Sequence, residues 1–262
     1  MEKVVENWMR KTKAFLLEMG ELTQLTFAIQ RWMFRKPHEG RLILQQMVKV
    51  GVESIPVALV TAFFTGMILC LQTGYTLETM MKGISQFVGA VVSVAMVREL
   101  GPLLTALIVA GRMGSAIAAE IGTMKVTEQI DALYTLSANP VKYLAVPRTI
   151  AFTLTLPLLT IFADLAGWLG GLLVAVLRLR STANTYIDSS LLALDVSDIL
   201  GGIVKSFFFG AFIAIISCRQ GFSTRGGAEG VGRSTTNAVV FSFMAVLISD
   251  YFLTALLAAF HF

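Results

Sequence analysis

The stretch MVRELGPLLTALIVAGRMGSAIAAEIGTMKVTEQIDAL, residues 96–133, decides how this chain folds. It begins within an apolar run that is long enough to cross a lipid bilayer and that contains two adjacent charges, Arg98 and Glu99. The run ends at Arg112, and residues of both charges follow it: Glu120, Lys125, Glu128 and Asp131. One continuous piece of sequence therefore places charge at membrane depth and an amphipathic surface just outside the membrane.

The composition of the whole chain is that of a membrane protein. Of its 262 residues, 55% are hydrophobic and only 15% are charged, whereas about a quarter of the residues in soluble domains are charged. The mean hydropathy is +0.73, and the apolar residues come in long blocks. The two cysteines, Cys70 and Cys218, form neither a disulfide framework nor a CxxC pair, so we expect both to pack as small apolar residues.

Residues 1–49 mix basic and aromatic side chains and lack the basic start and apolar core of a cleavable signal. Apolar residues recur there at helical spacing, at Trp8, Phe15, Met19 and Leu22. This pattern predicts an amphipathic helix lying on the membrane surface, and a small cytoplasmic helical cap is the alternative. A turn at 37–40 and a second short helix to about residue 49 complete this N-terminal domain, which precedes a membrane domain at 50–262.

Five apolar blocks of the length that a membrane-spanning helix needs follow the N-terminal domain. They cover residues 54–71, 87–111, 149–177, 199–218 and 238–260, within one or two residues. Polar loops at 72–86, 112–148, 178–198 and 219–237 separate them. We therefore expect an all-α polytopic membrane protein with about five transmembrane helices.

Lysine and arginine collect on one side of these spans, which predicts the orientation of the chain. The N-terminal domain and the loops 112–148 and 219–237 hold most of them, whereas the opposite side has only Lys82, Arg178 and Arg180. The basic side should be cytoplasmic. The N-terminus should then lie inside the cell and, with five spans, the C-terminus outside.

Charged residues within the spans are costly in hydrocarbon and usually face a bundle interior, a cavity or each other. A Gly-Pro dipeptide directly follows Arg98 and Glu99 and predicts a bend there. We expect Glu99 to face a cavity and Arg98 to face a partner or a phosphate, with a pair of structural anchors as the alternative. Lys205 and Asp250 lie at similar depths in the last two spans, which favours a structural ion pair over a role in transport.

Two stripes of small residues spaced four apart predict close helix packing, against the alternative that glycine is merely common in membrane helices. The first stripe is Ala163, Gly167, Gly171 and Ala175, and the second is Gly114, Ala118 and Gly122.

Past the second stripe, residues 120–133 have the pattern of one amphipathic helix whose apolar positions are available for docking: Ile121, Met124, Ile130 and Leu133. Such a helix, parallel to the membrane on the cytoplasmic side, is a surface that an energy-supplying partner protein could bind and displace. An ordinary loop helix has the same pattern.

Motifs for catalysis are absent from the sequence. It contains no G-x-x-x-x-G-K-[ST] nucleotide-binding loop, no G-x-S-x-G and no H-E-x-x-H. His38 and His261 have no metal-ligand neighbour at useful spacing. We therefore expect no catalytic site, no metal, no cofactor bound by the chain itself and no nucleic-acid partner.

Several blocks, in order, resemble the MlaE/YrbE family, the permease subunits of ABC transporters that move lipids with MCE-domain partners. The blocks are GMILCLQ (66–72), RELGP (98–102), AGRMGSAIAAEIGTM (110–124), TEQIDAL (127–133) and NP…PR (139–148). The resemblance implies a homodimer in the inner membrane, two cytoplasmic ATPase subunits that bind the ATP, a periplasmic ring of MCE-domain subunits and often a STAS-domain protein. It also implies a glycerophospholipid substrate and a role in outer-membrane lipid asymmetry.

The resemblance further implies two groups of functional residues. Lipid binding, in an outward-opening cavity between the two copies, is expected of Leu69, Gln72, Tyr75, Leu77, Arg98 and Glu99. Coupling to the ATPase is expected of Glu120, Gly122, Met124, Glu128, Gln129 and Asp131. Closure of the ATPase dimer on ATP would displace the segment 120–133, and the spans would then squeeze the cavity.

Two other functions remain open from the residues alone. A secondary transporter could use Arg98, Glu99, Lys205 and Asp250 as a proton or ion relay, although the five spans show no internal repeat. A passive scaffold of an envelope complex would need none of these charges for lipid movement.

Overall fold

The computed structural model describes residues 19–33, 40–80 and 84–259, and this part of the chain is helical apart from short turns. After a helical segment at 19–33, the helices are α2 (Gly40–Met80), α3 (Val88–Ala95), α4 (Gly101–Val109), α5 (Ser115–Val126), α6 (Gln129–Thr135), α7 (Val146–Leu177), α8 (Ala183–Ala193), α9 (Val196–Phe222) and α10 (Gly227–Ala259). A 3₁₀ turn, Ile84–Phe87, precedes α3, and π-helical turns at Met96–Leu100, Ala110–Gly114 and Val141–Ala145 precede α4, α5 and α7. The expected all-α class is confirmed.

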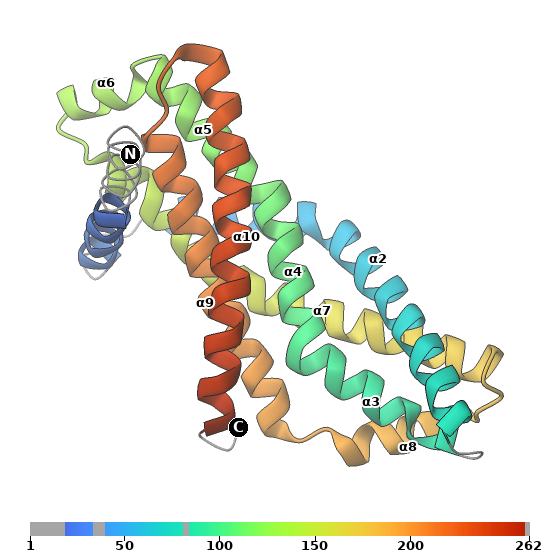
Figure 1. Ribbon diagram of the computed structural model, residues 1–262. Coiled ribbons are helices and arrows are strands. Elements are labelled where there is room, and N and C mark those ends of the chain that lie inside the picture. The colour runs from blue at the N-terminus through green and yellow to red at the C-terminus, as the bar shows by residue number, and fades with distance from the viewer. Residues whose placement is uncertain (1–18, 34–39, 81–83, 260–262) are drawn as a thin grey trace, which may run out of the picture.

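Five helical stretches among the described residues are long and apolar enough to cross a membrane, as predicted. They cover 40–79, 88–126, 141–177, 196–222 and 227–259. In Figure 1 these stretches run between one end of the molecule that carries α6, called the α6 end below, and an opposite end that carries α8, called the α8 end. The last turn of α10 lies at the α8 end (Figure 1).

The helices are longer than the apolar blocks that predicted them. The expected short helix before residue 49 is wrong, because α2 is one uninterrupted helix from Gly40 that runs through the predicted domain boundary. Most of the predicted loop at 112–148 is helical too: residues 88–126 form one continuous stretch, and helices also cover 129–135 and 141–148. Its 39 residues span about 58 Å, well beyond a hydrocarbon core of about 30 Å, so the helix continues into the polar region. The loop at 219–237 shrinks to the few residues between α9 and α10.

The single helix expected at 120–133 is also wrong, because the chain breaks between α5 and α6. Glu128 adopts a left-handed conformation with φ 61°, which is uncommon for a residue other than glycine. The Thr127 hydroxyl donates to the Thr123 carbonyl oxygen (2.8 Å) and closes the last turn of α5. With neither glycine nor proline at the break, the sequence carries no local signal for it.

The first stripe of small residues forms a helix contact, as predicted, and its partners are α2 and α3. All four residues are buried. A methyl group on Gly66 of α2 would meet the backbone of Gly167, and one on Gly171 would meet Val92 of α3. The buried Tyr186 hydroxyl also lies beside Gly171, and it donates to the Trp168 carbonyl oxygen (3.3 Å). Burial raises the pKa of this phenol, so the hydroxyl keeps its proton and remains a donor. Small residues thus let the backbones of α2 and α7 approach closely.

The second stripe packs against α9. Gly114 lies beside Ser217 and Ile213, and a side chain at Gly122 would meet Thr224. Around this contact, at the α6 end, buried residues of α5, α7 and α9 form one apolar core, while α2, α3, α7 and α8 enclose a second core at the α8 end. Two cores joined by α7 give the charged residues between them a fixed frame.

The α2–α7 contact predicts a size limit at Gly66. We expect Gly66→Val to lower the midpoint of thermal unfolding of the detergent-solubilised chain, since overpacking a close contact costs about 1–3 kcal/mol. Gly232→Val is the matched control, because no atom lies within 4 Å of the position its side chain would take. Equal midpoints for the two variants would contradict the close approach of α2 and α7.

Candidate functional site

A buried lysine organises the charged residues inside the spans. Lys205 of α9 is 3% exposed, and its Nζ lies 2.7 Å from Glu99 Oε1 and 3.3 Å from Asp250 Oδ1. It also donates to the Arg98 carbonyl oxygen (2.9 Å), and Thr254 of α10 donates to Glu99 Oε1 (3.1 Å). The ammonium thus has acceptors from two neighbouring elements, the turn that carries Arg98 and Glu99 and the helix α10, which is how a charge within hydrocarbon is normally held.

Arg98 and Glu99 point in different directions, as expected for neighbours on a helix. Arg98 Nε lies 2.6 Å from Oδ1 of Asp198, a residue that is 3% exposed. Asp198 also caps α9, because its Oδ2 accepts from the Asp195 backbone N–H (3.1 Å) in a capping box. The side chain of Arg98 remains 54% exposed, so most of its donors are available to a ligand.

The local backbone explains why these charges meet. The π-helical turn Met96–Leu100 adds a residue to one turn of the helix, and α4 begins directly after it at Gly101-Pro102. A side chain at Gly202 of α9 would meet the Val97 carbonyl, so glycine there lets α9 pass close to the turn. On the other side, Asp164 of α7 lies against Gly101, and its Oδ1 is buried without a hydrogen-bond partner among the described residues.

A small cavity of about 80 Å³ lies beside this cluster. Its lining residues are Arg98, Glu99, Ser197, Asp198, Gly201, Gly202, Lys205, Thr254, Leu257 and Ala258. The cavity combines basic and acidic side chains with the apolar end of α10. Such a wall can bind an anionic group of a ligand at Arg98 while an apolar part of the ligand packs against α10.

The structure separates the residues that were expected to bind lipid into two groups. Arg98 and Glu99 line the cavity, but Leu69, Gln72, Tyr75 and Leu77 of α2 do not. Leu69 and Leu77 pack partly buried against the second core, while Gln72 and Tyr75 are exposed. Within one chain, therefore, the α2 residues do not share a site with the charged cluster.

Asp198 and Thr254 are members of the cluster that the sequence did not single out. Asp198 is the last residue of the predicted loop 178–198, just before the fourth apolar block. The signal that could have found it is Arg98, which needs a carboxylate at its own depth.

A second set of ion pairs lies near the α6 end. Arg148 of α7 is 3% exposed, and its Nη2 lies 2.8 Å from Glu120 Oε1, while Lys49 Nζ of α2 lies 3.3 Å from Glu120 Oε2. Glu120 thus joins α5 to both α2 and α7. A displacement of α5 would reach two other spans through this one carboxylate.

The remaining residues expected to couple to the ATPase divide between the core and the surface. Gly122 is buried and Met124 packs on the core, whereas Glu128, Gln129 and Asp131 are exposed, with Asp131 Oδ1 3.1 Å from Lys125 Nζ. The expectation that Ile121 and Ile130 are available for docking is wrong, because both are buried in the chain's own core. The exposed apolar side chains of this region are Val126, Tyr134 and Leu136.

No group of three or more His, Cys, Asp or Glu side chains that could hold a metal ion occurs within the described ranges. The charged cluster itself consists of ion pairs and hydrogen bonds, and its side chains can bind charged or polar groups.

Comparison with known proteins places these features in a family context. Residues 43–256 match the family described as Permease MlaE. The chain is 44% identical over 252 residues, 94% of its length and 95% of the relative's, to a probable ABC transporter permease protein of Rickettsia felis. It is 46% identical over 217 residues to a probable ABC transporter permease protein of Synechocystis, covering 83% of this chain and 82% of the relative. It is also 43% identical over 215 residues to the chloroplastic protein TRIGALACTOSYLDIACYLGLYCEROL 1 of Arabidopsis thaliana, covering 82% of this chain and 61% of the relative.

Removing the buried cation should destabilise the cluster. We expect Lys205→Met to lower the free energy of unfolding by roughly 3 kcal/mol, because Glu99 and Asp250 then face each other without a cation. Adding Glu99→Gln and Asp250→Asn should restore most of that loss, which chemical unfolding of the detergent-solubilised protein can measure. A triple variant no more stable than Lys205→Met would show that the ion pairs are not what holds this region.

Proposed function

The chain belongs to the MlaE permease family, and from this premise we propose that it moves glycerophospholipids through a membrane with energy from a separate ATPase. As a member of the family it is a multi-pass permease subunit of an ABC transporter. The observation that carries the lipid proposal is the exposed guanidinium of Arg98, fixed by Asp198 beside the apolar end of α10. An arginine can bind a lipid phosphate in a two-pronged geometry while the acyl chains lie against apolar helices.

A homodimer would complete the lipid cavity. Only 11% of the apolar 18-residue segment of α10 is buried within one chain, against 28–50% of the corresponding segments of the other spans. Its exposed face includes Met244, Ile248, Tyr251 and Phe252. We propose that two copies meet so that their small cavities beside Lys205 and the exposed α2 residues Gln72 and Tyr75 surround one outward-opening space. The small cavity of the single chain is then one wall of the lipid site.

The exposed segment from Glu128 to Leu136 at the α6 end, called the exposed tip below, is the surface that we propose binds the ATPase. Glu128, Gln129 and Asp131 supply polar contacts there, and Tyr134 and Leu136 supply apolar area. When ATP closes the ATPase dimer, the tip moves, and the Glu120 ion pairs pass the displacement to α2 and α7. Because residues 88–126 are one continuous helical stretch, the same movement reaches the π-helical turn beside Lys205 and changes the cavity.

The family and the distribution of charge support a proposal for the cellular setting. We propose that the chain lies in the inner membrane with its N-terminus and the α6 end in the cytoplasm. A periplasmic ring of MCE-domain subunits would then meet the α8 end, and a STAS-domain protein could bind the ATPase. The role would be the maintenance of outer-membrane lipid asymmetry. The plant relative bears the name of a diacylglycerol lipid with a galactose headgroup, which supports a glycerolipid substrate but not its phosphate.

A second candidate is a proton or ion relay, favoured by the contact between Lys205, Glu99 and Asp250 inside the spans. Such a transporter would respond to a pH gradient with no ATPase present. The exposed tip at the α6 end would then have no energetic role.

The coupling proposal predicts that the double variant Glu128→Gln/Asp131→Asn inserts and dimerises normally but no longer transports lipid efficiently. We expect roughly a tenfold loss of ATP-dependent lipid transfer, because the removed charges contact the ATPase at a cost of about 1.4 kcal/mol. Transfer between vesicles that contain the chain and its ATPase measures this effect. Glu229→Gln, an exposed acid near the same end, is the control. Full transfer in the double variant would refute the assignment of the tip.

The lipid-site proposal predicts that Arg98→Gln purifies with less phospholipid. Mass spectrometry of lipid bound to the detergent-purified chain should show a severalfold reduction, because the loss of a charge-assisted phosphate contact costs about 1.5–3 kcal/mol. Arg41→Gln, which removes an exposed charge from the first turn of α2, should retain its lipid. An unchanged lipid content in Arg98→Gln would remove the main support for the site.

A further inference from the structure

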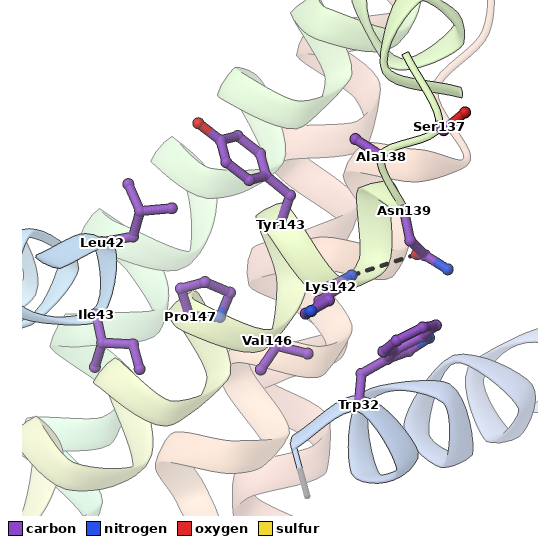
Figure 2. A pocket seen from close by; sticks show the side chains of 10 residues that line it. All are labelled: Trp32, Leu42, Ile43, Ser137, Ala138, Asn139, Lys142, Tyr143, Val146 and Pro147. Atoms are coloured by element: carbon purple, nitrogen blue, oxygen red, sulfur yellow. Dashed lines mark hydrogen bonds between the residues drawn. The ribbon is translucent and has the colours of Figure 1, made fainter. Parts of the chain in front are cut away.

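A second, larger cavity lies at the α6 end, far along the spans from the Lys205 cluster. It has a volume of about 310 Å³ and lies between the helical segment 19–33, the first turn of α2 and the chain from Ser137 to Pro147. We call it the junction cavity. Figure 2 shows the Lys142 side chain near its centre, between Trp32 and Pro147, with Tyr143 and Leu42 on one side and Asn139 on the other.

The charge in the junction cavity is positive. Among the described residues that line it, Lys142 is the only charged one. Its Nζ lies 5.6 Å from the centroid of the Trp32 ring, and it forms no ion pair with any carboxylate of the described ranges. The ring therefore holds the lysine in place, while no carboxylate in the described part of the chain neutralises its ammonium.

The backbone around Lys142 favours the same sign of ligand. The helical stretch that leads into α7 begins at Val141, and its dipole favours negative charge nearby, although its first N–H groups already donate to Asn139. Asn139 Oδ1 accepts from the Val141 N–H (2.9 Å) and the Lys142 N–H (3.4 Å), which fixes the lysine at the cavity wall. Ser137, which also lines the cavity, is held in a left-handed conformation with φ 58°, a strained geometry that the fold maintains here.

The surroundings of the junction cavity match the surface of a bilayer. Lysine, tryptophan and tyrosine together are the residues that lie at headgroup level in membrane proteins. The opposite wall is apolar, formed by Leu42 and Ile43, and from there α2 continues with the exposed Leu44 and Val48. A phosphate at Lys142 would therefore have an apolar path beside it, suited to acyl chains.

We propose that the junction cavity binds the phosphate headgroup of an anionic phospholipid from the leaflet at the α6 end. Lys142 pairs with the phosphate, Trp32 and Tyr143 enclose the headgroup, and the acyl chains lie along the exposed face of α2. This site is distinct from the transport cavity beside Lys205, and it does not depend on which lipid is transported. Basic pockets between helices at this level of a membrane are suited to anionic headgroups.

A lipid in this place would influence coupling. The cavity wall from Ser137 to Lys142 is the connection between α6, which carries the exposed tip, and α7, which carries Arg148. An occupied cavity would tie this connection to the segment 19–33 through Trp32.

Quenching of Trp32 fluorescence by brominated lipids tests the proposal directly. The full chain, with Trp8→Phe and Trp168→Phe so that Trp32 is the sole tryptophan, is reconstituted into phosphatidylcholine vesicles. Brominated phosphatidylglycerol or brominated phosphatidylcholine is added at equal mole fraction. We expect the apparent affinity for the anionic lipid to be about fivefold higher, the effect of one lysine at a membrane surface.

Variants of the same chain separate the site from general surface charge. Lys142→Gln should remove the preference for the anionic lipid, whereas Lys142→Arg should keep it, which shows that the altered position still folds. Arg41→Gln should also keep the preference, because Arg41 is exposed at the start of α2 and does not line the cavity. An unchanged preference in Lys142→Gln, or no preference in the parent chain, would overturn the proposal.

Two added components distinguish other occupants. Millimolar inorganic phosphate should leave the quenching unchanged, and its removal of the preference would indicate a site for a soluble anion instead of a lipid. Binding of the ATPase subunit should also leave the preference in place. Its loss at that step would mean that a side chain of the partner occupies the cavity.

Discussion

A charge within hydrocarbon must be paired, and the pairing of Lys205 is the constraint on which the arrangement of the spans depends. Its ammonium, on α9, is satisfied when the π-helical turn Met96–Leu100 and α10 come together around it, because each of these two elements supplies an acceptor. Gly202 and Gly101 let the neighbouring helices approach the turn closely enough for this to happen. The same arrangement leaves the guanidinium of Arg98 partly exposed at a small cavity. A requirement of stability thus creates the polar wall that we assign to lipid binding.

The two ends of the molecule are joined by helices that exceed the thickness of a bilayer core. Residues 88–126 form one continuous helical stretch that runs from the α8 end, past Glu99, to the start of the exposed tip (Figure 1). Near the α6 end, Glu120 binds Arg148 and Lys49 and so ties this stretch to α7 and α2. Long helices with buried ion pairs move as units, since a packed interior transmits displacement with little compression. Under the coupling that we propose, energy from a separate ATPase subunit reaches the cavity through these helices.

Long-range order was more predictable from the sequence than local geometry. The apolar blocks predicted five spans, and the small-residue stripe on the third span predicted a contact face, because both signals are repeated over many residues. The left-handed Glu128, the inward direction of Glu120 and the pairing of Arg98 with Asp198 were not predicted. Each depends on which distant side chain lies opposite, and the sequence of one helix does not contain that information. The helices also extended past their apolar blocks, since ion pairs such as Lys49–Glu120 satisfy polar residues within a helix.

The most direct measurement is lipid movement in vesicles that contain this chain with or without its ATPase subunit. Fluorescent phospholipid should move when the ATPase and hydrolysable ATP are both present, and it should stay in place when a non-hydrolysable analogue replaces ATP. The chain alone should leave the lipid in place even under an imposed pH gradient. Lipid movement driven by the gradient in vesicles that lack the ATPase would contradict the assignment of this chain as a passage powered by another subunit.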